Sequence, residues 1–444
     1  MNAVLIAVIV MLVLSLLRVH VVLALLIGSI VGGITAGLSL QETMQVFSEG
    51  LGGGASIALS YAILGAFAVA ISQTSLPDAL VNWVIKLVGR KSDSTRKNLS
   101  KALIFFFLLM IACFSQNIIP IHIAFIPILI PPIIKILNQL KIDRRAIAAI
   151  LTFGLIAPYI LLPYGFGYVF QGIIVENIVQ NGLDVTMSQV TPAMIIPVAG
   201  MFLGLLVAVF ISYRKPRIYE QRDIVRDTPS PEEEKSAASA NWSIIAALIA
   251  IVVTLVVQTK SESMIIAGLA GIIVLYVTRA LKWNGSDKVL TDGMKMMAFI
   301  SFVMISAAGF SEVIRATGHV ELLVEQVLNI VGESQGVTAL LMLVVGLILT
   351  LGIGSAFSTV PILATIFVPL GMAVGFSPMA IITLIGTAGA LGDAGAPASD
   401  STLGPTAGLN ADGQHNHIWD TCVPTFLHYN IPLIIFGWIA AMMF

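Results

Sequence analysis

The sequence is poor in charge and in cysteine. Only 11% of its 444 residues are charged and 57% are hydrophobic, whereas soluble domains carry about 25% charged residues. A water-soluble globular protein is therefore excluded, and the long continuous apolar runs argue against the short alternating strands of a membrane β-barrel. The net charge of −1 argues against a nucleic-acid partner. The two cysteines, Cys113 and Cys422, lie inside apolar runs and imply neither a disulfide framework nor a metal cluster.

What is present is a series of apolar runs, with a mean hydropathy of +0.98. We predict an all-α polytopic protein of the cytoplasmic (inner) membrane of a prokaryote, with the lipid bilayer as its main partner. The first run, from Met1 to Leu17, has no basic residue ahead of it and no small-residue cleavage site. It is therefore expected to be a retained span and not a signal peptide.

Lysine and arginine predict the orientation, because they gather on the cytoplasmic side of membrane proteins. Of the 23, only Lys260 and Arg315 fall outside a few short stretches, which are Arg18, 86–101, 135–145, 214–235 and 279–295. Placing these stretches inside puts both the N and the C terminus outside. The hydrophilic segment 214–241 is the expected cytoplasmic linker, which separates a first membrane repeat, 1–213, from a second, 242–444.

The two halves of the chain align with each other. Ala146–Gly165 lies over Ala380–Ser399 without a gap, and Phe47–Gly54 lies over Leu290–Met297. Each half predicts five crossings, with spans near 21–40 and 56–73 in the first, a helical hairpin (102–134 and 336–372) and a broken span (146–165 and 379–400). Five is odd, so the second repeat is predicted to be inverted. Inverted repeats with discontinuous helices are typical of secondary transporters.

The densest group of intramembrane polar residues is GDAGAPASDSTLGPT, Gly392 to Thr406. Ionisable groups inside a membrane are costly and mark functional sites. Gly395 and Pro397 interrupt the helix and free backbone carbonyls. With the side chains they form an oxygen-rich cage that suits Na⁺, while a desolvated carboxylate suits H⁺. The predicted cation-binding and coupling residues are Asp393, Ser399, Asp400, Ser401 and Thr402; no cofactor is expected beyond Na⁺ or H⁺, and no other metal.

The tips of the two predicted hairpins form a second group. Each precedes a proline-led helix, at Pro120 or Pro361, whose N-terminal amides favour an anion or a carboxylate. We predict that these tips bind a small-molecule substrate through Ser115, Gln116, Asn117, Ser355, Ser358 and Thr359. An ordinary serine-bearing membrane helix is the alternative.

Two further residues are candidates for proton-linked groups. Glu312 is either such a group or half of an interfacial ion pair with Arg315, three residues on. His122 follows the first hairpin tip and is either a proton relay or a packed core histidine. His415, His417 and His428 flank Asp420 in a segment that we expect to be a loop and not a metal site.

The segment Gly392–Thr406 resembles the signature of the NhaC-like sodium/proton antiporter family, within the ion transporter superfamily. This resemblance implies a transporter with two hairpins and two broken helices, a homodimer, and ion-coupling roles for the five residues from Asp393 to Thr402 named above. Ala394 and Ala398 depart from the family pattern, which often has Lys and Leu there. The ending WDTCVPTFLHYNIPL is similar to a branch that includes proposed amino-acid permeases, histidine among the candidate substrates.

Two transport functions remain open, and no enzymatic activity is expected. The first is exchange of Na⁺ for H⁺ by alternating access. The second is Na⁺- or H⁺-coupled uptake of an amino acid or small carboxylate, which the polar hairpin tips favour. An intramembrane aspartyl protease is disfavoured because Ala390 stands where its motif needs glycine.

Overall fold

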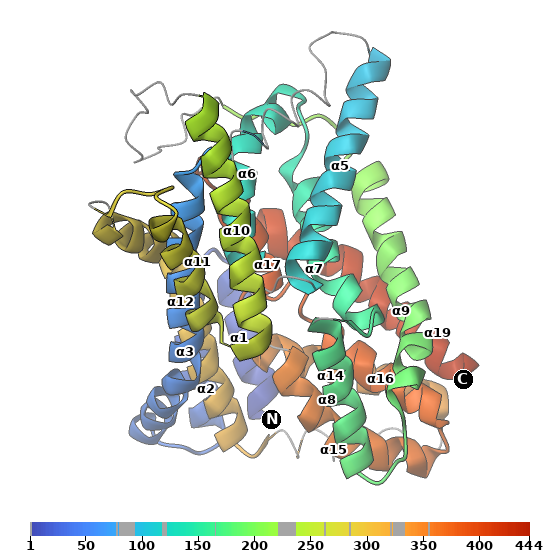
Figure 1. The fold of residues 1–444 in the computed structure, drawn as a ribbon. Coiled ribbons are helices and arrows are strands. Elements are labelled where there is room, and N and C mark those ends of the chain that lie inside the picture. Colours follow the sequence, from blue (N-terminus) through green and yellow to red (C-terminus); the bar gives the residue numbers. More distant parts are fainter. Residues whose placement is uncertain are drawn as a thin grey trace.

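The computed structural model describes residues 2–76, 79, 94–117, 122–164, 166–220, 237–261, 263–283, 286–319, 322, 334–353 and 356–444. These residues form helices joined by short connections, and no β-strand occurs among them (Figure 1). Five of the described helices are long and apolar enough to cross a bilayer: Arg144–Leu161, Met187–Ser212, Asn241–Gln258, Gln335–Gly352 and His417–Met443. The chain is an all-helical, multi-pass membrane protein, as predicted.

The helices follow one another in the chain with short connections. They are α1 (Ala3–Leu16), α2 (Val21–Thr35), α3 (Leu40–Ser72), α5 (Ser94–Asn117), α6 (His122–Gln139), α7 (Arg144–Leu161), α8 (Phe166–Gln180), α9 (Met187–Val207), the π-helical η1 (Ala208–Ser212), α10 (Ala237–Ser261), α11 (Met264–Val277), α12 (Ser286–Ala316), α14 (Gln335–Ile353), α15 (Ala356–Val374), α16 (Pro378–Ala390), α17 (Asp400–Leu409), η3 (His417–Cys422), α18 (Val423–Thr425), η4 (Phe426–Asn430) and α19 (Ile431–Met443).

Short polar side chains start several of these helices. Ser39 and Glu42 form a reciprocal capping box at the start of α3, and Asp143 accepts from the Arg145 amide at the start of α7. Ser377 and Ser399 cap α16 and α17 in the same way. The helix starts therefore follow from local sequence.

Two predicted boundaries differ from the structure. Crossings were expected near 21–40 and 56–73, but α2 ends at Thr35 and α3 runs unbroken through the glycine-rich stretch from Leu40 to Ser72. The capping box at Ser39 starts α3 early, and no proline interrupts it. The segment expected to be a loop around Asp420 is also helical, because η3 begins at His417.

The long helices α3 and α12 pack side by side (Figure 1). Glycines make this close contact possible, since a Cβ on Gly293 would lie 2.2 Å from the Ala66 nitrogen and one on Gly65 would lie 2.5 Å from the Gly293 oxygen. Further along the pair, a Cβ on Gly50 would lie 2.9 Å from the Ala308 oxygen. Small residues let membrane helices approach until their backbones touch.

Helices from both halves of the chain share the buried core. The larger cluster draws on α1–α3, α5–α9, α12 and α14–α19, and a smaller cluster joins α3 and α12 to α10 and α11. Contacts such as those of α9 with α19 and of α17 with α6 cross between the halves. The two halves thus interlock within one body instead of forming separate domains.

The α3–α12 contact provides a test of glycine packing. Gly293→Ala should lower stability by roughly 1–3 kcal/mol, because its Cβ meets backbone atoms of α3 that cannot move independently. Gly52→Ala on α3 is the matched control, since a Cβ there would meet nothing within 4 Å. The measurement is the temperature at which the detergent-purified protein loses its monodisperse elution peak. Equal temperatures for the two variants would contradict this packing.

Candidate functional site

Two interrupted helices meet in the interior. The first interruption separates α7, which ends at Leu161, from α8, and the second separates α16, which ends at Ala390, from α17. In the second interruption, Gly392 and Gly395 have φ values of +89° and +104°, which side chains with a Cβ rarely adopt. Every residue from Leu391 to Ser399 is buried.

Polar side chains satisfy the backbone groups that the second interruption exposes. The Asn430 amide oxygen accepts from the Gly392 amide at 3.0 Å, while its NH₂ group donates to the Ala394 carbonyl. The Thr402 hydroxyl lies 2.7 Å from the Ala396 carbonyl oxygen. A buried backbone group without a partner is costly, so these side chains hold the non-helical backbone in one shape.

His417, at the start of η3, also contacts the second interruption. Its Nε2 lies 2.8 Å from the Pro397 carbonyl oxygen and its Nδ1 lies 2.8 Å from the Thr406 hydroxyl. A carbonyl only accepts, so Nε2 carries a proton. His417 is therefore a structural partner of the second interruption.

Asp393 is the buried carboxyl group at the junction of the two interrupted helices. Asp393 exposes 7% of its surface to solvent. The Tyr159 hydroxyl, at the end of α7, donates to Asp393 Oδ2, and the Ser399 hydroxyl lies 3.5 Å from Oδ1. The ring of Tyr159 is held edge-on by Phe166 and Phe170 of α8. One hydrogen bond thus connects the two interruptions directly.

No described basic side chain forms an ion pair with Asp393; its described partners are the two hydroxyl groups. The neighbouring charged group is Asp400, half-buried at the first position of α17. A buried carboxylate without a positive partner is strongly disfavoured in a low-dielectric interior. This arrangement favours a bound cation or a proton on Asp393.

The other predicted coupling residues lie beside Asp393. The Ser399 hydroxyl caps α17 by accepting from the Ser401 amide at 3.2 Å, and the Ser401 hydroxyl lies 3.4 Å from an Asp400 carboxylate oxygen. Thr152 of α7 donates to the Ser401 carbonyl at 3.1 Å. The structure therefore gathers the predicted group, Asp393 to Thr402, at one place and fastens it to α7.

A buried ion pair joins α7 to the segment just after α17, at the end of α17 away from Asp393. The guanidinium of Arg144, at the start of α7, contacts both carboxylate oxygens of Asp412 at 2.6 Å, and the two side chains are 0% and 1% exposed. Arg144 also donates to the Leu409 carbonyl at 2.9 Å, the last residue of α17. Burial acts to raise the pKa of Asp412, but hydrogen bonds and charge from Arg144 hold the pKa below its ordinary value.

Among the six predicted hairpin-tip residues, the structure describes the side chains of Ser115 and Thr359. Ser115 is buried on α5, where its hydroxyl donates to the Ala112 carbonyl of its own helix. Thr359 is buried on α15, beside Val360, which packs on Gly389 of α16. The side chains of Gln116, Asn117, Ser358 and His122, and all of Ser355, lie outside the described residues.

Glu312 lies at the contact between α12 and α3 and not at the interrupted helices. It lies on α12, where its Cβ packs at Gly50 of α3, and the described residues show no ion pair between it and Arg315. It does not join the interrupted helices.

Several residues at the site were not predicted as site residues from the sequence, among them Tyr159, Asn430 and Arg144. Tyr159 stands 234 residues before Asp393, which is the offset of the aligned segments. That offset was the available signal for Tyr159. Asn430 and Arg144 carried no such signal, because their partners are remote in sequence.

Comparisons with known proteins agree on one family. A family model described as "Na+/H+ antiporter family" matches residues 150–438, and a second, "Na+-H+ antiporter family", matches residues 2–88. The chain is 58% identical to "Putative amino acid transporter YuiF" of Bacillus subtilis, with 100% of both chains covered. It is 55% identical to an uncharacterized membrane protein of Vibrio parahaemolyticus, again with 100% of both covered.

Two solved structures are similar at lower levels. The YdaH transporter of Alcanivorax borkumensis has a TM-score of 0.44 and 16% identity, with 90% of this chain and 87% of that one covered. MtrF of Neisseria gonorrhoeae has a TM-score of 0.42 and 17% identity, with 91% and 84% covered.

The Arg144–Asp412 pair predicts unequal roles for two adjacent arginines. Arg144→Gln should destabilise the protein by about 3–5 kcal/mol, because it leaves a buried carboxylate unpaired. Arg145→Gln should cost less, because the buried Asp143 carboxylate keeps Arg217 at 3.8 Å and the residue-145 backbone amide as partners, and the Arg145 side chain is 35% exposed. Thermal unfolding of both variants in the same detergent measures the difference.

The same pair has a defined pH dependence. Because the folded pKa of Asp412 is lowered, its stabilising contribution is fully present above the unfolded carboxyl pKa of about 3.9 and is lost as pH falls through the lower folded pKa.

Equal thermal midpoints for Arg144→Gln and Arg145→Gln at neutral pH would contradict the structural role of the buried pair.

Proposed function

Because this chain belongs to the Na+/H+ antiporter family, we propose that it is a cation-coupled secondary transporter in which Asp393 binds Na⁺ and H⁺ in competition. Asp393, Ser399, Asp400, Ser401 and Thr402 form the proposed coupling site. The protein exchanges the two ions across the membrane by alternating access.

One observation carries this proposal. Asp393 is buried at the junction of two interrupted helices and touches only hydroxyl groups among its described partners, with a second carboxylate close by. A buried carboxylate beside a second carboxylate disfavours its own ionised form unless a positive charge is present. Na⁺ and H⁺ are then alternative ways to neutralise the same group, and this competition couples their gradients.

The surrounding residues prepare the site for a small hard cation. Asn430 and Thr402 hold the interrupted backbone, so that its oxygen atoms keep their positions when the ligand changes. Na⁺ takes oxygen ligands, which Asp393 and Ser399 supply together with the neighbouring backbone. In the proposed cycle, cation binding weakens the bond from Tyr159 to Asp393 and so loosens the link between α7 and the second interruption.

We further propose that the two halves, 1–213 and 242–444, are inverted repeats joined by the cytoplasmic linker 214–241. The contact of Tyr159 with Asp393 supports this, because residues at equivalent positions meet where a two-fold axis passes between them. The contacts between α3 and α12 show the same two-fold relation in a second way, because one contact maps onto another. Gly65 packs on Gly293 and Gly50 on Ala308, and each contact becomes the other under a shift of 243 residues.

Helix packing supports the same symmetry. The contacts of α5 with α7, of α6 with α17 and of α7 with α9 recur as contacts of α14 with α16, of α15 with α8 and of α16 with α19. Inverted repeats of this kind bind ions near the membrane midplane and expose the site to one side at a time.

Both termini are proposed to lie outside. The Asn2 side chain donates to the His319 carbonyl, and Trp438 donates to the Gly336 carbonyl. The two ends of the chain are thus tied to residues on either side of one segment, 319–336, which the charge distribution assigns to the outer face.

A second candidate function is cation-coupled uptake of an amino acid or a small carboxylate. The observation that favours it is the 58% identity, over the full length, with a relative named for amino-acid transport. In this version the cation still binds at Asp393, and the substrate binds at the hairpin tips, including Ser115 and Thr359.

Removal of the carboxylate tests the coupling site. In proteoliposomes with a trapped pH dye, Asp393→Asn should reduce the Na⁺-driven pH change to the level of empty vesicles. Asp184→Asn is the matched control, because it removes an exposed carboxylate from the connection between α8 and α9 and should leave the signal unchanged. Normal Na⁺ dependence in a correctly folded Asp393→Asn protein would refute the assignment.

Added amino acids distinguish the two transport functions. If wild-type vesicles respond to a Na⁺ jump without amino acids, exchange of Na⁺ for H⁺ is the activity. If they respond only when a pool of amino acids is present, the protein is a coupled permease. Dividing the pool, with histidine as one fraction, then identifies the substrate.

A further inference from the structure

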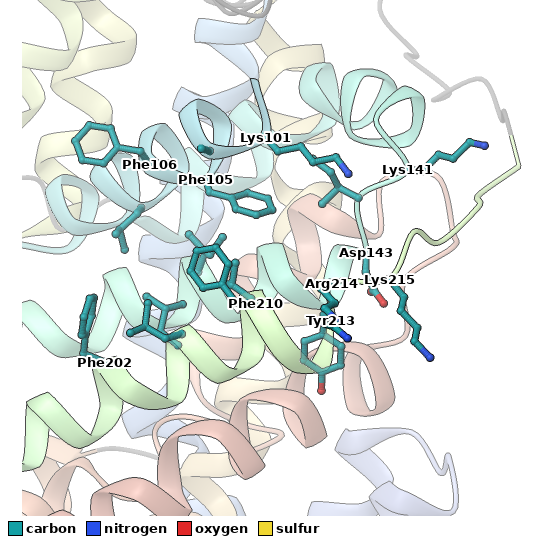
Figure 2. Close-up of a pocket in the computed structure, with 17 residues that line it drawn as sticks. Lys101, Phe105, Phe106, Lys141, Asp143, Phe202, Phe210, Tyr213, Arg214 and Lys215 are labelled. Atoms are coloured by element: carbon teal, nitrogen blue, oxygen red, sulfur yellow. The ribbon is translucent and has the colours of Figure 1, made fainter. Parts of the chain in front are cut away.

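A pocket lies between α5, α7 and the α9–η1 helix, and no residue of either helix interruption lines it. Its volume is about 490 Å³, in the range of sites that hold small organic molecules. Figure 2 shows its lining, with aromatic side chains at one end and amino groups at the other. The proposed coupling residues do not line it.

The inner part of the pocket is an apolar groove. Its wall consists of Phe105, Phe106, Leu109, Phe202, Leu206 and Phe210. Several of these rings point outward, since Phe106 is 62% exposed and Phe210 is 63% exposed. Because η1 continues an apolar membrane span, Met187–Ser212, lipid hydrocarbon and not water is the solvent at this surface.

The mouth of the pocket is basic. Lys101 comes from α5, Lys141 from the α6–α7 turn, and Arg214 and Lys215 follow η1 (Figure 2). Within the part of the chain that the structure describes, none of these four side chains forms an ion pair. The carboxylate at the mouth, Asp143, is neutralised by Arg145 at 2.6 Å, with Arg217 at 3.8 Å.

The two helices that frame the groove present the same order of residues. α5 has the basic Lys101 before its apolar stretch, which ends at Leu109. The α9–η1 helix has its apolar stretch first, from Phe202 to Phe210, and the basic Arg214 after it, so both helices place a basic residue at one end of an apolar stretch. Each eight-residue stretch spans about 12 Å, close to the roughly 15 Å depth of one hydrocarbon leaflet. An apolar groove of one leaflet's depth with a basic mouth matches the shape and charge of a phospholipid.

We propose that this groove binds an anionic phospholipid of the cytoplasmic leaflet, with an acyl chain along the phenylalanines and the phosphate among Lys101, Lys141, Arg214 and Lys215. Basic pockets between membrane helices on the cytoplasmic side suit anionic headgroups. The groove also touches Ile150 of α7, so the bound lipid packs against the helix that carries Tyr159.

The test is lipid retention by the full chain in detergent, measured by native mass spectrometry. Phosphatidylglycerol and phosphatidylcholine with the same acyl chains are supplied at equal concentration. Phosphatidylglycerol should be retained at least about tenfold more, because each basic residue beside an anionic lipid contributes on the order of a fivefold change in affinity. Excess inorganic phosphate should not displace it.

Matched variants locate the site. Changing Lys101, Lys141, Arg214 and Lys215 to Gln should abolish the preference for phosphatidylglycerol. Changing Lys135, Lys282, Lys288 and Lys295 to Gln removes the same charge from exposed positions that do not line the groove, and should preserve the preference. Ala102→Trp fills the groove without changing charge and should also lower retention.

Several outcomes would overturn the proposal. They are equal retention of both lipids by the wild type, equal losses of the preference in the two four-residue glutamine variants, and displacement by inorganic phosphate. A groove variant that alters only the proportion of dimer would assign the groove to a second copy of the chain. None of these outcomes bears on Asp393.

Discussion

A buried carboxyl group that has no positive side chain among its described partners is the constraint on which the rest of this structure depends. Asp393 lies where two helices are interrupted, with hydroxyl partners from Tyr159 and Ser399. Such a group is stable only when a small cation or a proton joins it.

Holding non-helical backbone inside a membrane requires a partner for every exposed amide and carbonyl. Asn430, Thr402 and His417 supply these partners from helices that follow the interruption. The Arg144–Asp412 pair then ties the far end of α17 to α7. The proposed ion-binding segment is thus held by fixed partners at both ends of α17, and the hydrogen bond from Tyr159 to Asp393 is the direct link between the two interruptions.

Much of the fold followed from local sequence. Proline and glycine predicted the interruptions near Pro163 and Gly392, and the charge distribution together with the aligned segments predicted a multi-pass helical protein with paired halves. The error at α3 was also local, because the capping box at Ser39 starts the helix well before the span expected near 56–73. The hairpin-tip prediction depended on convergence in space, and for Ser115 the structure shows a hydroxyl bonded to its own helix.

The sequence by itself determined which residue types can carry charge inside the membrane, because an apolar environment makes each ionisable residue an exception that stands out. It also determined where helices must stop. Only the tertiary structure decided which remote residues meet: Tyr159 with Asp393, Arg144 with Asp412, and the glycines of α3 with α12. These contacts depend on helix packing across hundreds of residues, for which local periodicity carries no information.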